Sequence, residues 1–306
     1  MAADRINLGL LTHVDDDGHG QSLTAASAKS TICFSGYILD VTGSGMCRTA
    51  EVENSVSRIS VFPHDQRPEV TASVITILSA GVLVKPLGFG SSPSAVTVVV
   101  SSSDFEVAMQ RLFDSFAFTA CGSYGQWQAV CRMDEQQLRE VRFSYNEQII
   151  TTYGFTSQTG LDLWNVSLQI ENMGRFGAFL SELGEQGFKL PFLISNSVPD
   201  KNGIHFSFAL AEDQRGRARQ VFDKHMPGKI CYCRGPVSLL FVHGPHFGDR
   251  YGIAEAFVTA LREGGIHLLA LSCAVSSISA VIEGNDPHKA IGALHTRFQT
   301  PGGNAR

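Results

Sequence analysis

Near the start of the chain, the residues with the clearest potential for chemistry are two histidines and two aspartates. His13, Asp15, Asp17 and His19 alternate along one polar segment. Alternating imidazole and carboxylate groups can converge on a divalent metal ion, or they can form a solvated acidic turn between two strands. The spacing matches no defined metal site and therefore favours the turn.

Two other pairs contain potential metal ligands. His243 and His246 share one predicted loop, and Cys231 and Cys233 lie on the same face of a predicted strand. Each pair can bind a metal, but histidines in such a loop more often form surface hydrogen bonds, and strand cysteines are more often small buried apolar residues. No Ser-His-Asp or Cys-His group has the surroundings that activate a nucleophile. The sequence therefore predicts no catalytic residue, no metal and no cofactor.

The composition excludes several classes of protein. Of the 306 residues, 43% are hydrophobic and 17% are charged, a balance that excludes a disordered chain and allows two or three domains. The net charge is -5 and no basic cluster is present, which argues against nucleic acid and membrane partners. The seven cysteines are scattered, as expected of reduced thiols. With no recognisable apolar leader or span of about 20 apolar residues, we expect a cytoplasmic protein.

The elements that must position these residues follow an apolar pattern that occurs three times, in the order strand, helix, strand, strand, helix. In the second copy, Val166, Leu168 and Ile170 alternate with polar residues, as in a strand with one buried face. Helices follow from the stripes of apolar residues at helical spacing. The predicted strands are 56–62, 82–87 and 95–100 in the first copy, 166–170, 188–197 and 204–210 in the second, and 237–243, 266–273 and 277–283 in the third.

Residues of the third copy carry a resemblance to a known family. The segments Gly252-Ile-Ala-Glu-Ala-Phe-Val-Thr-Ala-Leu, Gly265-Ile-His-Leu and Ala293-Leu-His-Thr-Arg-Phe resemble the second ACT domain of aspartate kinases. Residues 149–298 together resemble the whole regulatory half of such an enzyme. The resemblance implies an α+β fold of tandem ferredoxin-like (βαββαβ) ACT domains, with antiparallel sheets and helices on one face.

The resemblance also predicts a domain organisation. Residues 51–133, 149–228 and 229–306 are expected to form three ACT or ACT-like domains, with a linker over 134–148. Residues 1–50 form an N-terminal segment of unclear role with predicted strands over 6–14 and 31–41. A closing strand over 126–133 is expected in the first copy. No lysine-bearing glycine-rich nucleotide segment is present, and 50 residues cannot hold a kinase fold, so the chain is not expected to phosphorylate aspartate by itself.

In the family, an amino acid effector binds where the loop after the first strand meets the first helix, beside the second strand of a neighbouring ACT unit. The free N–H groups and the positive end of the helix dipole suit a carboxylate there. The positions that match by resemblance are Met173, Gly174, Arg175 and Phe176 at the helix start, Lys189, Leu190, Ser195, Asn196 and Ser197 around the second strand, and Gly252 and Ile253 in the third copy.

One departure from the family bears on the effector. Lysine-sensitive members carry an acidic residue on the second strand, and Pro191 stands at that position here, so lysine is disfavoured. We expect a non-catalytic regulatory module that binds a small amino acid and forms a homodimer by pairing sheet edges. The alternative is a structural subunit with degenerate sites that docks on a separate aspartate-kinase-like enzyme.

Overall fold

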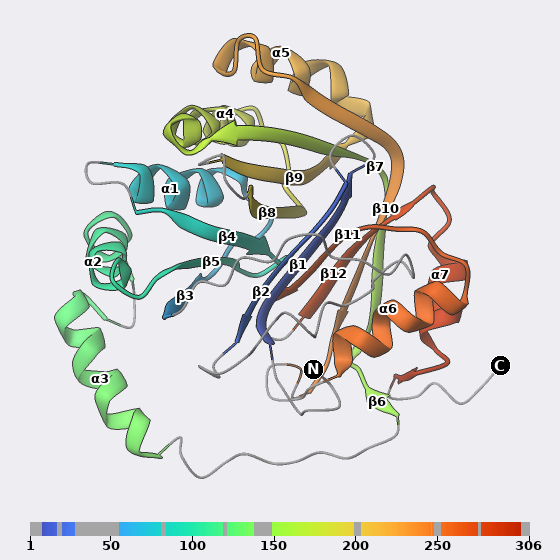
Figure 1. Ribbon diagram of the computed structural model, residues 1–306, viewed down its shortest axis with the longest axis horizontal. Helices are drawn as coiled ribbons and strands as arrows, with labels where there is room; N and C mark the ends of the chain where they lie inside the picture. The colour runs from blue at the N-terminus through green and yellow to red at the C-terminus, as the bar shows by residue number, and fades with distance from the viewer. Residues whose placement is uncertain are drawn as a thin grey trace.

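One large antiparallel sheet organises the chain (Figure 1). The computed structural model describes residues 8–16, 20–27, 55–80, 84–118, 121–137, 149–198, 203–245, 247, 252–274 and 277–300. Within these residues the sheet has 11 strands, in the order β2-β1-β11-β12-β10-β7-β9-β8-β4-β5-β3. The short strands β6 and β13 pair separately, in parallel.

Several predicted strands match the observed ones closely, but the strand predicted over 82–87 lies at Pro86–Ser91, and the strand predicted over 166–170 extends from Gly154 to Gln169. The strands are β1 (Leu8–Asp16), β2 (Gly20–Ser27), β3 (Val56–Val61), β4 (Pro86–Ser91), β5 (Val96–Ser101), β6 (Ile150–Thr151), β7 (Gly154–Gln169), β8 (Phe192–Val198), β9 (Gly203–Ala211), β10 (Cys231–His243), β11 (Leu268–Ala274), β12 (Ser277–Glu283) and β13 (Phe298–Gln299). The helices are α1 (Pro68–Ser79), α2 (Phe105–Ser115), α3 (Tyr124–Gln137), α4 (Met173–Glu185), α5 (Arg215–His225), α6 (Ile253–Glu263) and α7 (His288–Leu294). The expectation of a mixed chain built on antiparallel strands is confirmed.

Each copy of the repeat forms a block of neighbouring strands. The second copy occupies the order β10-β7-β9-β8, with α4 and α5 between its strands in the chain. The first copy occupies β4-β5-β3, and it joins the second copy because β4 pairs antiparallel with β8. The N-terminal hairpin β1-β2 joins the third copy in a similar way, through antiparallel pairing of β1 with β11.

Two long strands belong to more than one block. The first part of β10, Cys231 to Arg234, pairs with the last part of β7, and Val237 to His243 pairs with the first part of β7 and with β12. The register shifts between these two parts, at Gly235 and Pro236. Both strands therefore continue from one copy into the next, and the predicted domain boundary at 228/229 stays a prediction.

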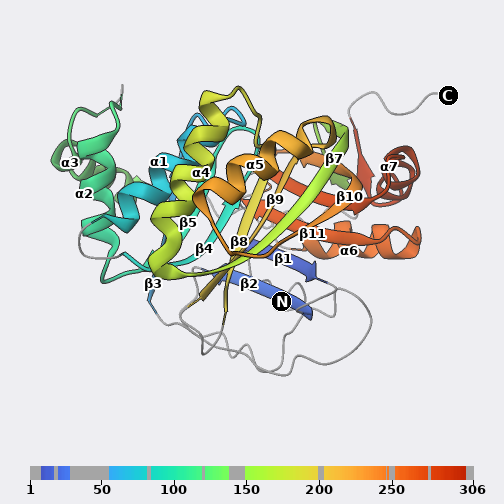
Figure 2. The same ribbon diagram turned by 90° about the horizontal axis from the view of Figure 1, so that it is seen from above.

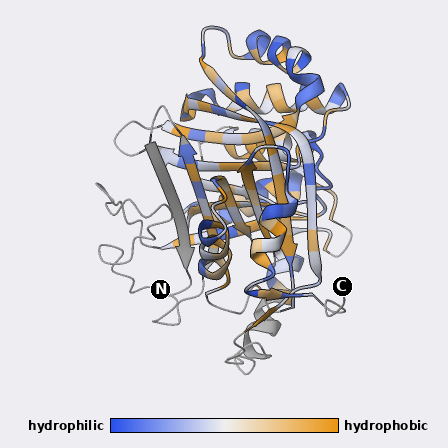
Figure 3. Cartoon of the chain, turned by 90° about the vertical axis from the view of Figure 1, so that its right-hand side faces the viewer, coloured by the Kyte–Doolittle hydropathy of each residue, from blue (hydrophilic) through white to orange (hydrophobic). Residues whose placement is uncertain are grey.

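The sheet folds over itself, so that its two halves face each other. One apolar core lies between α1, α4 and α5 and the half of the sheet that contains β8 and β9, and a second lies under α6 and α7. A third core consists only of strand residues, among them Phe192, Leu239 and Val281, and fills the space between the two halves. The helices thus cover the outer faces, and apolar residues concentrate on the central strands (Figures 2 and 3).

The strand predicted over 126–133 is wrong. This segment belongs to α3, and Ser123 and Gln126 mark its start: the Ser123 hydroxyl accepts the Gln126 N–H (3.3 Å), and the Gln126 side chain accepts the Gly122 N–H (2.8 Å). Serine followed by glutamine three positions later is a capping signal that the strand assignment overlooked. Tyr124 and Trp127 then pack on Phe113 of α2 at helical spacing.

In the N-terminal segment, β1 confirms the strand predicted over 6–14. The second predicted strand, 31–41, lies outside the described residues. Residues 20–27, which were predicted to be a turn and a stretch of small residues, form β2 instead. This strand pairs along the whole length of β1.

Glycine allows α1 and α4 to pack side by side across the junction of β4 and β8. A Cβ atom on Gly177 of α4 would lie 2.6 Å from Thr76 Oγ1 and 3.4 Å from the Ala72 carbonyl oxygen of α1. The first distance is too short for a real contact. A side chain at this position would therefore require the Thr76 side chain to rotate away or the two helices to separate.

We predict that Gly177→Ala lowers the free energy of unfolding by about 1–3 kcal/mol through overpacking. Gly174→Ala on the same helix is the matched control, because a Cβ there meets nothing within 4 Å and gains up to about 1 kcal/mol of helix propensity. Thr76→Ala should restore part of the loss in the Gly177 variant. Urea titration of the four proteins measures this, and equal stability of the two glycine variants would contradict the packing.

Candidate functional site

Of the four effector-site residues predicted at the start of α4, two lie in the core and two face the solvent. Met173 and Phe176 are fully buried, and the Phe176 ring stacks on Phe206 with centroids 4.3 Å apart. Gly174 and Arg175 are exposed. A ligand at this helix start would therefore meet the backbone and Arg175, because the two apolar side chains already fill the core.

Two of the predicted polar residues on β8 hold strands together. Ser195 is fully buried, and its hydroxyl accepts the Phe89 N–H of β4 at 2.9 Å. Asn196 is 1% exposed, and its side-chain oxygen accepts the Thr12 hydroxyl of β1 at 2.6 Å. Both groups already have partners within the protein. Ser197 is half-buried.

The predicted residues separate into two places. Gln169 at the end of β7 and Val198 at the end of β8 both lie opposite Gly203, so the end of β8 lies near the start of α4. Lys189 and Leu190 precede β8 and lie at its other end. The predicted helix start and the predicted beginning of the strand are therefore not brought together.

Leu190 instead meets the start of α1. Its N–H donates to the Gln66 carbonyl at 2.8 Å, which joins the segment before α1 of the first copy to the strand β8 of the second. Asp65 and Gln66 both have left-handed backbone conformations, with φ of 58° and 56°. Such conformations cost about 1–3 kcal/mol each in residues other than glycine, and they concentrate at ligand sites.

A buried histidine fixes this segment. The His64 Nδ1 atom lies 3.1 Å from the Ser92 carbonyl oxygen, and Nε2 lies 3.1 Å from the Thr71 hydroxyl. A carbonyl only accepts, so Nδ1 carries the proton and Nε2 accepts from Thr71. Burial lowers the pKa of His64, and the ring is therefore neutral at pH 7.

Arg67 provides a positive charge at the same place. It occupies the N-cap position of α1, makes no capping hydrogen bond, and is followed by Pro68 at the first helical position. Its Nε atom is buried without a hydrogen-bond partner among the residues that the structure describes. A helix N-terminus and a guanidinium donor side by side are suited to a carboxylate.

The sequence predicts the helix that begins at Pro68 but did not single out its start as a ligand site, although a signal for such a site exists. The segment before Pro68 occupies the same position in the first copy as the predicted site before Gly174 in the second. It also contains the polar run His64, Asp65, Gln66 and Arg67. Placing it against Leu190 requires the pairing of β4 with β8, which no local pattern reveals.

The site predicted in the third copy is described only in part. Gly252 has a left-handed φ of 84° at the N-cap of α6, a conformation that glycine adopts without strain, and Ile253 is buried. Residues 248–251 lie outside the described part of the chain.

The candidate metal ligands have other surroundings. Burial raises the pKa of Cys231 to about 12 and that of Cys233 to about 11, so both thiols are protonated at pH 7. His243 lies against the Tyr153 ring, and His246, Asp17 and His19 fall outside the described residues. Among the residues that are described, no three His, Cys, Asp or Glu side chains form a group that could hold a metal ion.

The described helices include none that is long and apolar enough to cross a membrane.

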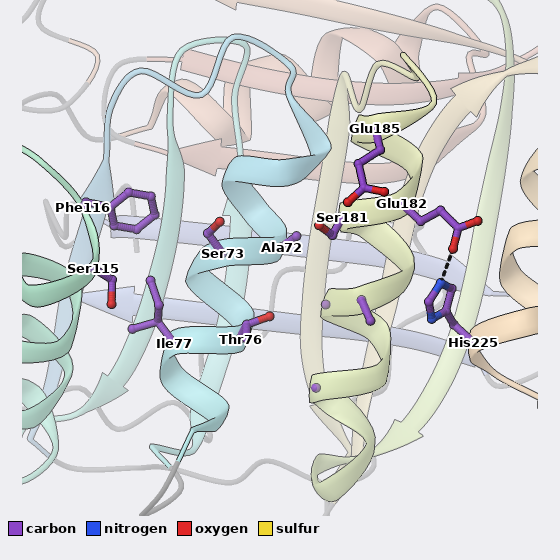
Figure 4. A pocket seen from close by; sticks show the side chains of 13 residues that line it. Ala72, Ser73, Thr76, Ile77, Ser115, Phe116, Ser181, Glu182, Glu185 and His225 are labelled. Atoms are coloured by element: carbon purple, nitrogen blue, oxygen red, sulfur yellow. Dashed lines mark hydrogen bonds and ion pairs between the residues drawn. The ribbon is translucent and has the colours of Figure 1, made fainter.

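An open groove of about 610 Å³ runs along α1 and α4 (Figure 4). Small residues of both helices line it, including Gly174 of the predicted site, and Phe116 closes one end. At the other end, the Glu182 carboxylate accepts from Lys224 at 2.7 Å and from His225 at 2.6 Å. The Lys224 and His225 hydrogen bonds lower the pKa of Glu182, so its negative charge is already compensated.

Comparison with known proteins identifies a shared fold. No family model matches the sequence, and no curated protein matches it. The structure of aspartate kinase from Synechocystis has a TM-score of 0.74 and 15% sequence identity, with 97% of this chain and 50% of that chain covered. The ligand-free regulatory subunit of aspartate kinase from Thermus thermophilus has a TM-score of 0.42 and 15% identity, with 48% of this chain and 99% of that one covered.

An aspartate kinase is thus a structural neighbour, as the sequence resemblance predicts. At 15% identity, the likeness to the Synechocystis enzyme shows a shared fold. This chain spans about half the length of that enzyme.

The lowered pKa of His64 predicts a pH dependence. Below about pH 6.5 the unfolded chain binds a proton at this histidine that the folded chain does not, so the free energy of unfolding falls as the pH drops from 7 to 5. In the His64→Gln variant, the free energy of unfolding should depend less steeply on pH. The slope should decrease by up to about 1.4 kcal/mol per pH unit, the contribution of one proton. Urea titrations across this range measure it, with the exposed His243→Gln as control. If the free energy of unfolding depended on pH equally in the wild type and in His64→Gln, the result would contradict a buried neutral histidine.

Proposed function

We propose that the chain is a non-catalytic regulatory module of tandem ferredoxin-like ACT units that binds a small amino acid. The strand order β10-β7-β9-β8, with one helix after the first strand and one after the third, supports the ferredoxin-like assignment for the second copy. The shared fold with half of an aspartate kinase supports the same reading.

The observation that carries the proposal is the hydrogen bond from the Leu190 N–H to the Gln66 carbonyl. It brings the start of a helix in one unit against the second strand of the neighbouring unit. We assign the principal effector site to this place. The sequence predicts a different place, at Met173 to Phe176. That segment is the equivalent helix start in the second copy, on the other side of the β4–β8 junction.

The chemistry of the site fits the carboxylate of an amino acid. Pro68 has no N–H and the Val70 N–H donates to the Arg67 carbonyl, so the start of α1 contributes mainly the positive end of the helix dipole, beside the acidic side chain of Glu69. The buried Nε of Arg67 offers a donor that lacks a partner in the described structure. An unpaired buried donor costs free energy, and a bound carboxylate would recover it.

The surroundings are held in place before a ligand arrives. The ring of His64 binds Ser92 and Thr71, and the Ser91 hydroxyl accepts the Leu193 N–H at 2.7 Å. The His64 contacts and the Leu190 to Gln66 hydrogen bond hold the left-handed segment at Asp65 and Gln66 on both sides, so less freedom is lost when an effector binds.

The proposal predicts that one or a few common amino acids raise the midpoint of thermal unfolding of the purified chain. A ligand at about 100 times its dissociation constant stabilises by about 2.7 kcal/mol, which raises the midpoint by several degrees. Arg67→Gln should abolish the shift, and Arg175→Gln at the start of α4 is the matched control that should retain it. A thermal-shift screen followed by calorimetry provides the measurement.

The two variants separate the possible outcomes. Loss of the shift in Arg175→Gln alone would return the site to the start of α4, as the sequence predicts. Absence of any shift across the common amino acids would contradict the sensor function and favour a subunit that docks on another enzyme.

A further inference from the structure

A tight turn just before α1 carries two opposite charges. The Arg67 N–H donates to the His64 carbonyl at 3.0 Å, so Asp65 and Gln66 form the centre of the turn. Both central residues have left-handed φ angles, 58° and 56°, as in a type I′ turn. The Asp65 carboxylate and the Arg67 guanidinium are therefore two residues apart on a turn that a backbone hydrogen bond closes.

Neither of these charges is used within the described structure. Asp65 is exposed, and its side chain has no hydrogen-bond or ion-pair partner among the residues that the structure describes. The Arg67 side chain also lacks such a partner there, and its Nε atom is buried. The two charges thus belong to one turn without forming an ion pair with each other, and both are available to a ligand.

The surroundings of His64 show that these charges lie close together. Burial lowers the pKa of His64, and among the nearby charges Arg67 lowers this pKa further, whereas Glu69 and Asp65 raise it. All three charges therefore act on the same buried ring. The Glu69 carboxylate is directed toward α4, because a Cβ atom on Gly184 would lie 2.5 Å from its Oε2 atom. Asp65 is the acidic group that remains for a ligand at the turn.

We propose that Asp65 makes this site selective for free amino acids, by binding the α-ammonium group while Arg67 binds the α-carboxylate. The inference rests on the proposed function and names the class of its ligand. The two charged groups of an amino acid are attached to one carbon atom, so a site for it needs an acidic and a basic group close together. Each contact is a hydrogen bond between charged groups, which is stronger than one between neutral groups.

The same arrangement disfavours related acids. A 2-oxo acid, a 2-hydroxy acid and the C-terminus of a peptide each have the carboxylate but lack the α-ammonium group. In such a ligand the carboxylate would meet the negative charge of Asp65 without a compensating contact, and repulsion of this kind provides specificity. The site is therefore expected to respond to the amino acid and not to its deaminated relatives.

The test compares amino acids with 2-hydroxy acids on the intact chain. Calorimetry measures the dissociation constant of each common amino acid that raises the unfolding midpoint, and that of the 2-hydroxy acid with the same side chain, which has nearly the same size. The wild type should bind the amino acid at least about tenfold more tightly, as expected for one charge-assisted hydrogen bond.

Two variants assign this preference to a residue. Asp65→Asn should bind the amino acid and the 2-hydroxy acid about equally, because the amide has no charge, and asparagine adopts the left-handed conformation of the turn readily. Glu69→Gln is the matched control and should retain the preference. Circular dichroism checks that both variants are folded.

The outcomes separate this inference from the proposed function. Amino acids that bind the wild type no more tightly than their 2-hydroxy acids would overturn the role of Asp65 and leave the regulatory function in place. A folded Asp65→Asn variant that keeps the preference would do the same, as would loss of the preference in Glu69→Gln alone. Absence of binding by every common amino acid would overturn both.

Discussion

The pairing of β4 with β8 is the contact on which the arrangement of the first two copies depends. Its ladder is short, with Gly88, Phe89 and Gly90 opposite three residues of β8, and the hydroxyls of Ser91 and Ser195 accept N–H groups across it. This pairing brings α1 against α4 and brings the segment before α1 against Leu190. Without it, neither the helix contact at Gly177 nor the proposed site would exist.

The second constraint is the folding of the sheet on itself. Because β7 and β10 run through both halves, the halves are continuous in the backbone, and their inner faces bury Phe192, Leu239 and Val281 between them. The hydrogen bond between Thr12 and Asn196 crosses this space and ties the N-terminal hairpin to β8. Residues that resemblance assigned to effector binding thus have a structural part in joining the halves.

Much of the fold could be predicted from local patterns. The alternation at Val166 and Leu168 and the helical stripe of Phe176 and Phe179 predicted β7 and α4, since these periodicities depend only on which face is buried. The assignment failed at α3, where a capping signal at Ser123 outweighed strand propensity. The site was harder to predict, because alternation shows that Ser195 is on one face of a strand but not that β4 will cover it.

The position of the proposed site depends on contacts between residues more than 100 positions apart, such as Gln66 with Leu190. Such pairings leave no trace in a single sequence, whereas the chemistry of His64 and Arg67 is legible once they are placed. The proposed site is again a helix start near a cation, as in the sequence-based prediction, but it lies in the first copy of the repeat instead of the second.

Hydrogen exchange on the intact chain, with and without a mixture of the common amino acids, tests the central claim most directly. The account predicts that added amino acids slow exchange at the start of α1, over residues 64–72, and just before β8, over residues 188–193, and leave the start of α4 nearly unchanged. Protection centred on residues 173–176, or no change in any segment, would contradict it.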